Sequence, residues 1–295
     1  MRKKAPQQRR GSASPSGLRD RKKAPQQRRG SASPSGLRDR IEKPVLWHIP
    51  VSHYSEKVRW ALALKGVEHE RKAPPPGAHM LVAMALTRST HHTFPVLRLD
   101  GRNIGDSAAI IDALERRYPE PALYPADQDA LDRALELQRF FDTELGPHIR
   151  LYAWHELRRD PERMAQLSAT LMPGPLARWA PARAAASGLA STFVQLRFRV
   201  ASPETAQAAG EKVIAALDGL EAELEANGGD YLVGDSFTVA DLTAASLFYP
   251  LVDPPEGPKV LPDAPEAIER FRAPLADRRG YRWVEEMFAR HRHPA

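Results

Sequence analysis

The chain of 295 residues contains no cysteine. Disulfide bonds, cysteine-ligated zinc and a cysteine nucleophile are therefore excluded from its chemistry. It also has no run of 18 consecutive apolar residues, so we expect no membrane-spanning helix, and its start lacks the apolar core of a signal peptide. We therefore expect a soluble, cytoplasmic protein that makes no membrane contact.

Several sequence motifs that mark catalytic sites are absent as well. We find no Walker loop, dinucleotide fingerprint, nucleophile elbow or zincin motif. The ten histidines do not form a metal-ligating pattern. His91 and His92 are adjacent, and His148 and His155 are seven residues apart with no carboxylate partner at a known spacing. We therefore predict no metal site and no resident cofactor.

The basic character of the chain is confined to its start. The formal net charge is +6, but residues 1–40 alone carry 13 Lys and Arg against two Asp, and the rest of the chain is mildly acidic. Residues 2–20 recur without change at 21–39. Each copy is dominated by Pro, Gly, Ser, Gln and Arg, a composition typical of disorder.

This duplicated tail has two opposing interpretations. An Arg- and Ser-rich segment with few acids can be an arm for nucleic acid or an acidic partner, or an organelle transit segment. The transit segment would need an amphipathic stripe, which the tail lacks. The alternative is a solvated extension, or a misplaced start or cloning duplication, and we favour it because composition alone discriminates poorly between these possibilities. We therefore predict a disordered tail over residues 1–40 and no nucleic-acid partner.

The chain from residue 41 to 124 has the pattern of a small α/β domain. Residues 45–49 form a short run of β-forming residues and predict a strand. Residues 55–66 have apolar side chains at helical spacing and end in glycine. Residues 94–104 read as two strands joined by Asp-Gly, a hairpin signal, and residues 107–118 as a helix capped by its first serine.

From residue 125 to 295 the strand signals largely vanish. Helical periodicity marks residues 127–158, with a kink expected at Gly-Pro 146–147, and residues 204–227, which are followed by two glycines. Further helices are expected from residue 239 and near 281–290. The segments 172–190 and 254–265 read as long connections. The order predicts one α/β domain followed by an all-α domain.

Four short motifs occur in an order that resembles the glutathione S-transferase superfamily. They are Ser-His-Tyr-Ser-Glu-Lys-Val-Arg at 52–59, Thr-Phe-Pro-Val-Leu at 93–97, Asp-Ser at 106–107 and Ser-Phe-Thr-Val-Ala-Asp at 236–241. Each motif alone is weakly specific, whereas the ordered set is fairly specific. The resemblance implies a thioredoxin-like domain that binds glutathione, then a helical domain.

The resemblance also implies roles for individual residues. Ser52 would activate the thiol of glutathione, and a cis peptide at Pro95 would turn the Phe94 main chain towards it. Asp106 and Ser107 would hold its γ-glutamyl end. The fourth motif predicts a capping box in which Thr238 and Asp241 exchange hydrogen bonds, a structural role.

Tyr54 and Ser55 are competing donors beside Ser52. The spacing Ser-x-x-Ser excludes disulfide exchange through an enzyme cysteine. Two features depart from the family pattern: Thr93 stands where a basic residue often precedes the cis proline, and a Pro-rich insert replaces the usual second strand. Of three aromatic residues at 152–155, namely Tyr152, Trp154 and His155, one or more would line the electrophile pocket or pack within the helical domain.

These inferences lead to one predicted function and one alternative. We predict an enzyme that ionises glutathione, or a related thiol, for attack on a small hydrophobic electrophile or for reduction of a peroxide, with detoxification as its broad role. We also expect a homodimer. The alternative is a non-catalytic binding or scaffold protein that keeps the same fold.

Overall fold

The structure, a computed structural model, describes residues 42–74, 78–171, 181, 188, 202–259, 261 and 263–292. The predicted tail and most of the connection expected at 172–190 lie outside these residues. The described strands are β1 (Val45–Trp47), β2 (Glu70–Lys72), β3 (Val96–Leu99) and β4 (Arg102–Gly105). The described helices are α1 (His53–Leu64), α2 (His79–Thr87), α3 (Ser107–Arg117), α4 (Gln128–Phe140), the π-helix η1 (Phe141–Leu145), α5 (Gly146–Arg158), α6 (Pro161–Leu171), α9 (Pro203–Asn227), α10 (Val239–Val252), α11 (Glu266–Arg272), the 3-10 helix η2 (Ala273–Leu275) and α12 (Arg279–His291).

The strands form one mixed sheet in the order β2-β1-β3-β4. Strand β1 runs parallel to β2 and antiparallel to β3, and β3 pairs with β4 as an antiparallel hairpin. Asp100 and Gly101 connect the hairpin with positive φ angles of 48° and 76°. Two positive φ values suit the right-handed twist of a two-residue hairpin, which is why Asp-Gly is favoured there. The predicted hairpin is confirmed.

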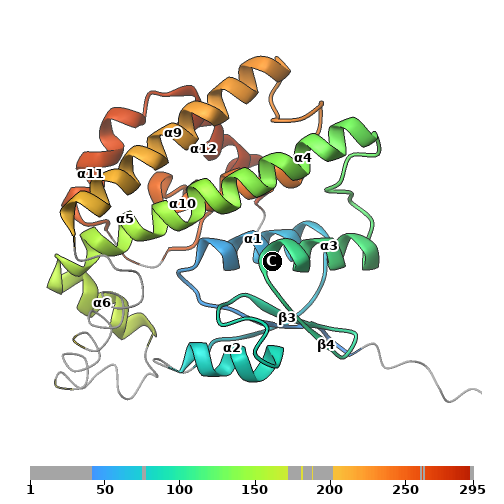
Figure 1. Cartoon of the computed structure of the whole chain (residues 1–295), viewed down its shortest axis with the longest axis horizontal. Coiled ribbons are helices and arrows are strands. Elements are labelled where there is room, and N and C mark those ends of the chain that lie inside the picture. Colours follow the sequence, from blue (N-terminus) through green and yellow to red (C-terminus); the bar gives the residue numbers. More distant parts are fainter. Residues whose placement is uncertain are drawn as a thin grey trace, which may run out of the picture. The chain divides into compact units, whose positions relative to one another are not determined.

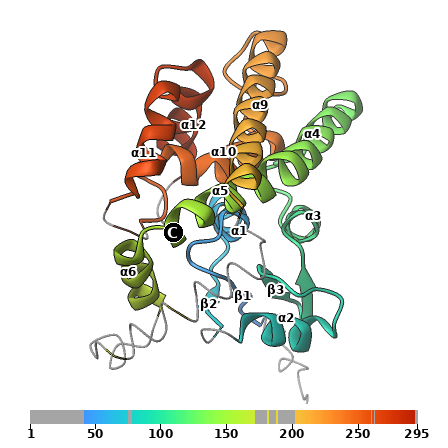
Figure 2. The ribbon, with the colours of Figure 1, turned by 60° about the vertical axis from the view of Figure 1, so that its left-hand side comes forward.

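The two faces of the sheet bury different residues because side chains alternate along a strand. Leu46 and Leu97 point into the main core, which they share with α1 and α3. Trp47 and Val96 point the other way, into a smaller core that α2 covers with Ala83. Figures 1 and 2 show α1 and α3 on one side of the sheet and α2 on the other. The layers are those of a thioredoxin-like domain.

The main core continues without a break from the sheet into the helical half. Helix α10 packs against α1, and α12 packs against α10. Trp60 of α1 is fully buried, and its ring centroid lies 4.4 Å from that of Phe288 of α12. The predicted all-helical half is confirmed, and the predicted boundary at residues 124 and 125 falls between α3 and α4.

The structure differs from two expectations about local structure. The kink expected at Gly146 and Pro147 is instead a π-helical segment, η1, that ends just before Gly146; Pro147 lies in the first turn of α5, where its missing N–H is not needed. The second strand is not replaced, because β2 pairs in parallel with β1 ahead of the Pro-rich residues. The described residues of the segment 254–265 contain no helix, as expected, and α11 begins directly after it at Glu266.

The capping box of α10 is present as predicted. The Thr238 hydroxyl accepts a hydrogen bond from the Ala240 N–H, and the Asp241 carboxylate accepts one from the Thr238 N–H at 2.8 Å. Asp241 also accepts from the Leu232 N–H at 2.8 Å, which the sequence did not predict. The carboxylate therefore ties the preceding loop to the helix while it is fully buried.

Replacing Asp241 by alanine should destabilise the fold far more than replacing Thr238. Asp241→Ala leaves two buried N–H groups without an acceptor, so we expect a loss of about 3 kcal/mol of unfolding free energy. Thr238→Ala removes the cap bond from the Ala240 N–H and the bond from the Thr238 hydroxyl to Asp241, but it leaves no buried N–H of the loop without an acceptor, so it should cost about 1–2 kcal/mol. Urea unfolding of both variants measures the difference. Equal losses would contradict the role of Asp241 as the tie between loop and helix.

Candidate functional site

The register of the sheet brings three of the predicted motifs to one end. Val96 of β3 pairs with Trp47 of β1 on one side and with Gly105 of β4 on the other. The residues that follow Trp47, precede Val96 and follow Gly105 therefore leave the sheet at the same edge. These neighbouring segments carry Ser52, Phe94, Pro95, Asp106 and Ser107. The predicted site residues thus gather although they are up to 55 positions apart in the chain.

The peptide bond between Phe94 and Pro95 is cis, as predicted. The Phe94 side chain is buried in the small core beneath α2, together with Val96 and Ala83. Within the described residues no main-chain hydrogen bond outside the strands involves Phe94. The side chain thus anchors this residue, while pairing of its main chain with an extended peptide stays a prediction.

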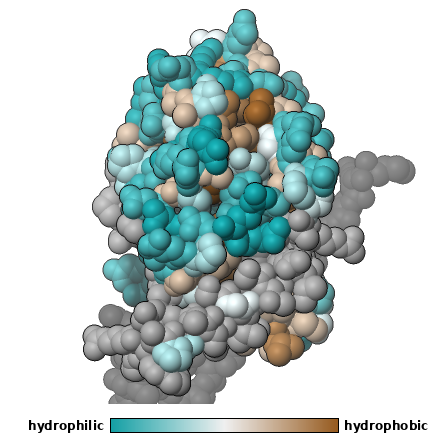
Figure 3. Space-filling view, turned by 90° about the vertical axis from the view of Figure 1, so that its left-hand side faces the viewer, coloured by the Kyte–Doolittle hydropathy of each residue, from teal (hydrophilic) through white to brown (hydrophobic). Residues whose placement is uncertain are grey.

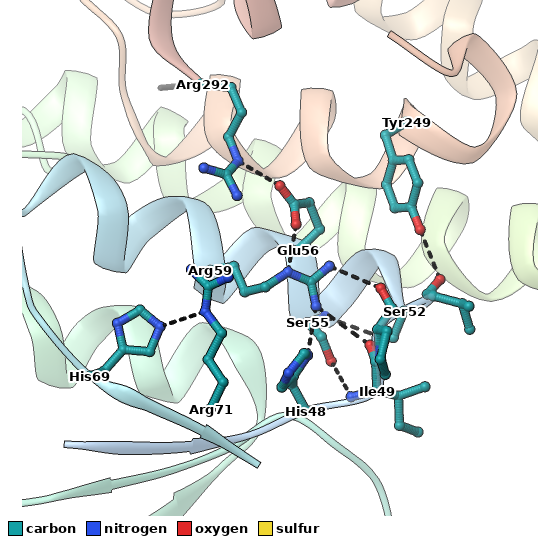
Figure 4. A network of polar contacts seen from close by, with 12 residues as sticks. His48, Ile49, Ser52, Ser55, Glu56, Arg59, His69, Arg71, Tyr249 and Arg292 are labelled. Atoms are coloured by element: carbon teal, nitrogen blue, oxygen red, sulfur yellow. Dashed lines mark hydrogen bonds and ion pairs between the residues drawn. The ribbon is translucent and has the colours of Figure 1, made fainter. Parts of the chain in front are cut away.

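The loop between β1 and α1 is held by its carbonyl groups (Figure 4). The Arg59 guanidinium donates to the carbonyl oxygens of Ile49 at 3.5 Å and Pro50 at 3.1 Å. The Tyr249 hydroxyl, from α10, donates to the Val51 oxygen at 2.9 Å. Three successive carbonyls before Ser52 are therefore fixed by side chains from two different helices.

Arg59 is itself fixed by buried partners. Its Nε lies 2.7 Å from a carboxylate oxygen of Glu56, a side chain with no exposed surface. The other carboxylate oxygen of Glu56 accepts a hydrogen bond from the Nε of Arg292 at 2.6 Å. The His48 Nδ1 lies 2.9 Å from Arg59 Nη1, and burial, assisted by the Arg59 charge, lowers the pKa of His48 to about 4. His48 is therefore neutral near pH 7 and accepts the hydrogen bond from Arg59.

Ser52 occupies the N-cap position of α1. Its backbone is extended, and its hydroxyl oxygen accepts a hydrogen bond from the Ser55 N–H at 3.2 Å. A hydroxyl group has one donor and two acceptor sites. Because the helix uses only an acceptor site, the Ser52 proton is left to donate, next to the positive end of the α1 dipole.

Tyr54 and Ser55, the two competing donors, both make hydrogen bonds within the fold. Ser55 is fully buried, and its hydroxyl accepts from the Ile49 N–H at 3.3 Å. The Tyr54 hydroxyl donates to the main-chain oxygen of Asp142 in η1 at 2.7 Å. The Ser55 side chain therefore joins the start of α1 to the preceding loop, and the Tyr54 side chain joins α1 to the helical half.

The first turn of α1 is bound to the π-helical segment and the start of α5. His53 Nε2 lies 3.0 Å from the Gly146 oxygen, and Lys57 Nζ lies 2.9 Å and 2.7 Å from the two carboxylate oxygens of Asp142. A β-carbon on Gly146 would lie 2.1 Å from the Tyr54 hydroxyl, so only glycine permits this approach. Sequence patterns gave no sign of these contacts, since each joins residues more than 80 positions apart.

Asp106, and not Ser107 as predicted, caps α3. One oxygen of its carboxylate accepts from the Ala108 and Ala109 N–H groups at 2.9 Å and 3.1 Å. Its φ of 72° and ψ of 130° lie in a region that costs energy for any residue with a side chain. Such strained residues cluster at ligand sites. Ser107 is buried as the first residue of α3.

The aromatic residues of α5 point to different surroundings. Trp154 packs in a cluster with Val51 and Leu157, directly beside the loop that carries Ser52. Tyr152 and His155 instead line a separate cavity of about 550 Å³ between α5, α9 and α11. Figure 3 faces the side where α11 and the start of α9 lie, and its described surface is mostly hydrophilic with small apolar patches. Of the three candidates, Trp154 alone neighbours the predicted site.

Two further features bear on the chemistry of the described residues. They contain no group of three or more His, Asp or Glu side chains arranged to hold a metal ion. In the same residues no helix has both the length and the apolar character needed to cross a membrane.

Family models match both halves of the chain. Residues 46–122 match the model described as glutathione S-transferase, N-terminal domain, and residues 179–278 match glutathione S-transferase, C-terminal domain. Among curated relatives, a probable maleylacetoacetate isomerase of Caenorhabditis elegans is 26% identical over 208 residues, which are 70% of this chain and 78% of that protein. A maleylpyruvate isomerase of Ralstonia sp is 33% identical over 102 residues, 34% of this chain and 47% of that protein.

Solved structures with the same fold are more distant in sequence. The β-etherase LigF from Sphingobium superposes with a TM-score of 0.54 at 18% identity, covering 83% of this chain and 99% of the other. A glutathione transferase of Phanerochaete chrysosporium gives a TM-score of 0.51 at 17% identity, covering 83% of this chain and 94% of the other. Identities this low show a shared fold.

The buried histidine at the start of α1, His53, predicts a loss of stability in mild acid. Burial, followed by the Arg150 charge, lowers the pKa of His53 to about 3. Below about pH 6.5 the unfolded chain binds a proton at His53 and the folded chain does not. Unfolding free energy should therefore fall as pH decreases from about 6.5 towards 3. His53→Gln, which keeps a donor for the Gly146 oxygen, should flatten this fall in urea unfolding series; a parallel pH dependence in both proteins would contradict it.

Proposed function

Because this chain belongs to the glutathione S-transferase superfamily, we propose that it is a glutathione-dependent enzyme in which the Ser52 hydroxyl stabilises the thiolate of bound glutathione. The observation that carries the proposal is the fixed position of Ser52. Its loop is tied by Arg59 and Tyr249, and its oxygen is engaged by the helix while its proton is left to donate.

The chemistry needs such a donor. A thiol with a pKa near ~8.5 is mostly protonated at neutral pH and is then a poor nucleophile. A hydrogen bond to the charged sulfur lowers its pKa, and the positive end of a helix dipole acts in the same direction. Both influences converge on a sulfur placed at Ser52. The absence of cysteine from the chain means that the reacting sulfur is supplied by the bound thiol.

The neighbouring segments suit the rest of glutathione. An extended peptide can pair with the main chain at Phe94, next to the edge of β3. The γ-glutamyl carboxylate would meet the Ser107 hydroxyl and N–H at the start of α3, a location that favours anions. One oxygen of Asp106 is used by the helix cap, and the second oxygen would face the γ-glutamyl ammonium group.

We further propose that the thiolate adds to an electrophilic carbon. Relatives of this chain are named isomerases of maleyl compounds, and another is named a probable glutathione S-transferase. One step accounts for both names: the sulfur forms a bond to one carbon of a polarised double bond, and the electron pair moves onto the substrate. Protonation then gives a conjugate, whereas rotation and expulsion of the thiolate give the isomer and return glutathione.

Replacing Ser52 by alanine should abolish thiol activation and leave binding almost intact. Removing a single donor to a developing anion typically lowers kcat by ~100-fold or more, and we expect this for Ser52→Ala. The ultraviolet absorbance of the bound thiolate should disappear at neutral pH. Ser52→Thr keeps a hydroxyl and a capping oxygen, so it should retain part of both signals.

Two results would count against the proposed mechanism. Unchanged turnover in Ser52→Ala would remove Ser52 from the chemistry. Tight glutathione binding by the unmodified chain without conjugation, isomerisation or peroxide reduction would favour the alternative of a binding protein with this fold.

Removing the charge of Asp106 should weaken glutathione binding without slowing the chemical step. Asp106→Asn keeps the capping oxygen, and asparagine tolerates a positive φ better than most residues. A lost hydrogen bond to a charged group costs about 1.5–3 kcal/mol, so the KM for glutathione should rise by roughly tenfold or more. Steady-state kinetics with kcat within a factor of about two tests this; an unchanged KM would remove Asp106 from the binding site.

A further inference from the structure

Glu56 binds two arginines, one with each oxygen of its carboxylate. Its Oε2 accepts from Arg59 Nε at 2.7 Å, and its Oε1 accepts from Arg292 Nε at 2.6 Å. The Glu56 side chain has no exposed surface, and the side chains of Arg59 and Arg292 are 5% and 10% exposed. Figure 4 shows the two arginines on opposite sides of the carboxylate. Arg292, which lies 236 positions further along the chain, therefore limits how much of Glu56 is left for Arg59.

This division of the carboxylate matters because of the shape of a guanidinium group. Its Nε–H and Nη2–H lie on the same side and form a fork of parallel donors that fits both oxygens of one carboxylate. Arg59 does not use the fork in this way. Its Nε donates to Glu56, whereas its Nη2 donates to the Pro50 oxygen at 3.1 Å. The Pro50 carbonyl thus receives the donor that a two-bond pair with Glu56 would use.

The remaining donors of Arg59 are engaged elsewhere. Its Nη1 lies 2.9 Å from His48 Nδ1 and reaches the Ile49 oxygen only at 3.5 Å. Within the part of the chain that the structure describes, Arg59 supplies the one hydrogen bond to the Pro50 oxygen. If Nη2 turned to Oε1 of the carboxylate, the Pro50 carbonyl would lose its donor two residues before Ser52.

The end of α12 is fastened to α1 by contacts that do not need the Arg292 side chain. The Trp60 Nε1 donates to the His291 oxygen at 2.9 Å, and the Trp60 ring packs against Phe288. The Arg292 N–H donates to the Phe288 oxygen at 2.9 Å and closes the helix. Replacing the Arg292 side chain should therefore leave this segment in place and release Oε1 of Glu56.

We propose that Arg292 is a positioning residue for the chemistry of Ser52. Its bond to Oε1 of Glu56 keeps Nη2 of Arg59 on the carbonyl of Pro50. Without Arg292, the buried Oε1 lacks a donor, and Nη2 lies beside the Nε that Glu56 already binds, so Arg59 closes its fork on the carboxylate. The loop is then released at Pro50, and Ser52 loses its fixed place. This inference rests on the proposed function, since its consequence is measured at the thiolate that Ser52 stabilises.

Two replacements of Arg292 separate its donor from its charge. Arg292→Gln puts an amide N–H at the place of Nε and has no charge, so it should keep Oε1 occupied. Arg292→Met keeps the length of the stem and offers no donor. The control Arg290→Met removes a neighbouring arginine whose ion pair with Asp230 is exposed.

The first measurement is the pKa of the bound thiol, from the ultraviolet absorbance of glutathione-saturated protein across a pH series. In Arg292→Met this pKa should lie about one pH unit higher than in the unmodified chain, because a misplaced donor stabilises the thiolate less. In Arg292→Gln and Arg290→Met it should stay within about 0.3 of the unmodified value. The affinity for S-methylglutathione, which has no ionisable thiol, should change by less than about twofold in every variant.

The second measurement is amide hydrogen exchange of the unliganded protein, which reports on the loop itself. The Ser52 N–H is bonded to the Ile49 oxygen at 3.0 Å. In Arg292→Met this N–H should exchange about tenfold faster than in the unmodified chain, because a loosened loop opens more often. Arg292→Gln and Arg290→Met should leave its exchange rate unchanged.

A double variant tests the fork of Arg59. In Glu56→Gln/Arg292→Met, the amide oxygen can accept from Arg59 Nε, while the amide nitrogen is a donor and cannot accept Nη2. No two-bond pair can form, so the thiol pKa and the exchange of the Ser52 N–H should return most of the way to the unmodified values. Values further from the unmodified chain than those of Arg292→Met would contradict the fork.

The outcomes separate this inference from the proposed function. A thiolate in the unmodified chain whose pKa is the same in Arg292→Met overturns the role of Arg292 and leaves Ser52 in place. A higher thiol pKa in Arg292→Gln, which keeps the donor, also overturns it, and this comparison remains if Arg292→Met does not fold. A parallel change in Arg290→Met shows a general effect of charge and overturns it as well. Absence of a thiolate in the unmodified chain overturns the proposed function, whereas faster exchange at Ser52 in Arg292→Met alone still supports control of the loop by Arg292.

Discussion

The predicted site depends on the hydrogen bonds that Arg59 donates to the loop before Ser52. A loop of five residues between a strand and a helix has no main-chain ladder of its own, so its carbonyl groups need other donors. Arg59 supplies donors to two of them, and Tyr249 supplies one to the next. A hydrogen-bonded loop holds the Ser52 hydroxyl in one place relative to the helix dipole, and preorganised donors are what stabilise a developing anion.

These hydrogen bonds require the charge of Arg59 to be buried. A network of ion pairs makes this burial possible. Arg59 is only 4% exposed and Glu56 is fully buried. A lone buried charge is costly, whereas a pair with its hydrogen bonds satisfied is tolerated. Glu56 satisfies two arginines at once, Arg59 from its own helix and Arg292 from beyond the end of α12. The site in the sheet domain is thereby coupled to the last described residue of the chain.

Helix α1 serves both halves of the molecule because its polar residues point in opposite directions. Lys57 and Arg59 are two residues apart, which is about 200° around a helix. Arg59 therefore reaches back to the loop, while Lys57 reaches Asp142 in the π-helical segment. The extra width of η1 and the missing side chain at Gly146 let the helical half approach closely enough for Tyr54 to bond the Asp142 main chain. One helix thus fixes Ser52 and positions α5 above it.

The sequence predicted best the features that depend on local patterns. The hairpin, the helices with clear periodicity and the capping box at Thr238 follow from neighbours in the chain, and they are confirmed. The cis peptide at Pro95 was inferred from a resemblance. The strand β2 was missed because it consists of three charged residues, Glu70, Arg71 and Lys72, which form a strand through pairing with β1 alone.

The roles of individual polar residues in the site were harder to predict. Ser52 and Ser55 are both serines near the start of a helix. Nothing in the local sequence shows that Ser55 is buried and bonded to the Ile49 N–H, while the Ser52 hydroxyl has a proton left to donate. The cap at Asp106 depends on a positive φ, which favours glycine and is only occasionally adopted by aspartate.

The absence of cysteine and the placement of charge together define what this site can do. A hydroxyl group at Ser52 can stabilise a thiolate, but it cannot store oxidising equivalents or form a mixed disulfide, so the sulfur chemistry belongs to the bound thiol. Glutathione carries an ammonium group at one end and its sulfur in the middle, and in the proposed binding mode the second oxygen of Asp106 would face the ammonium group. A donor fixed at Ser52 and a carboxylate fixed at Asp106 would hold the bound thiol in one direction, with its sulfur at the start of α1.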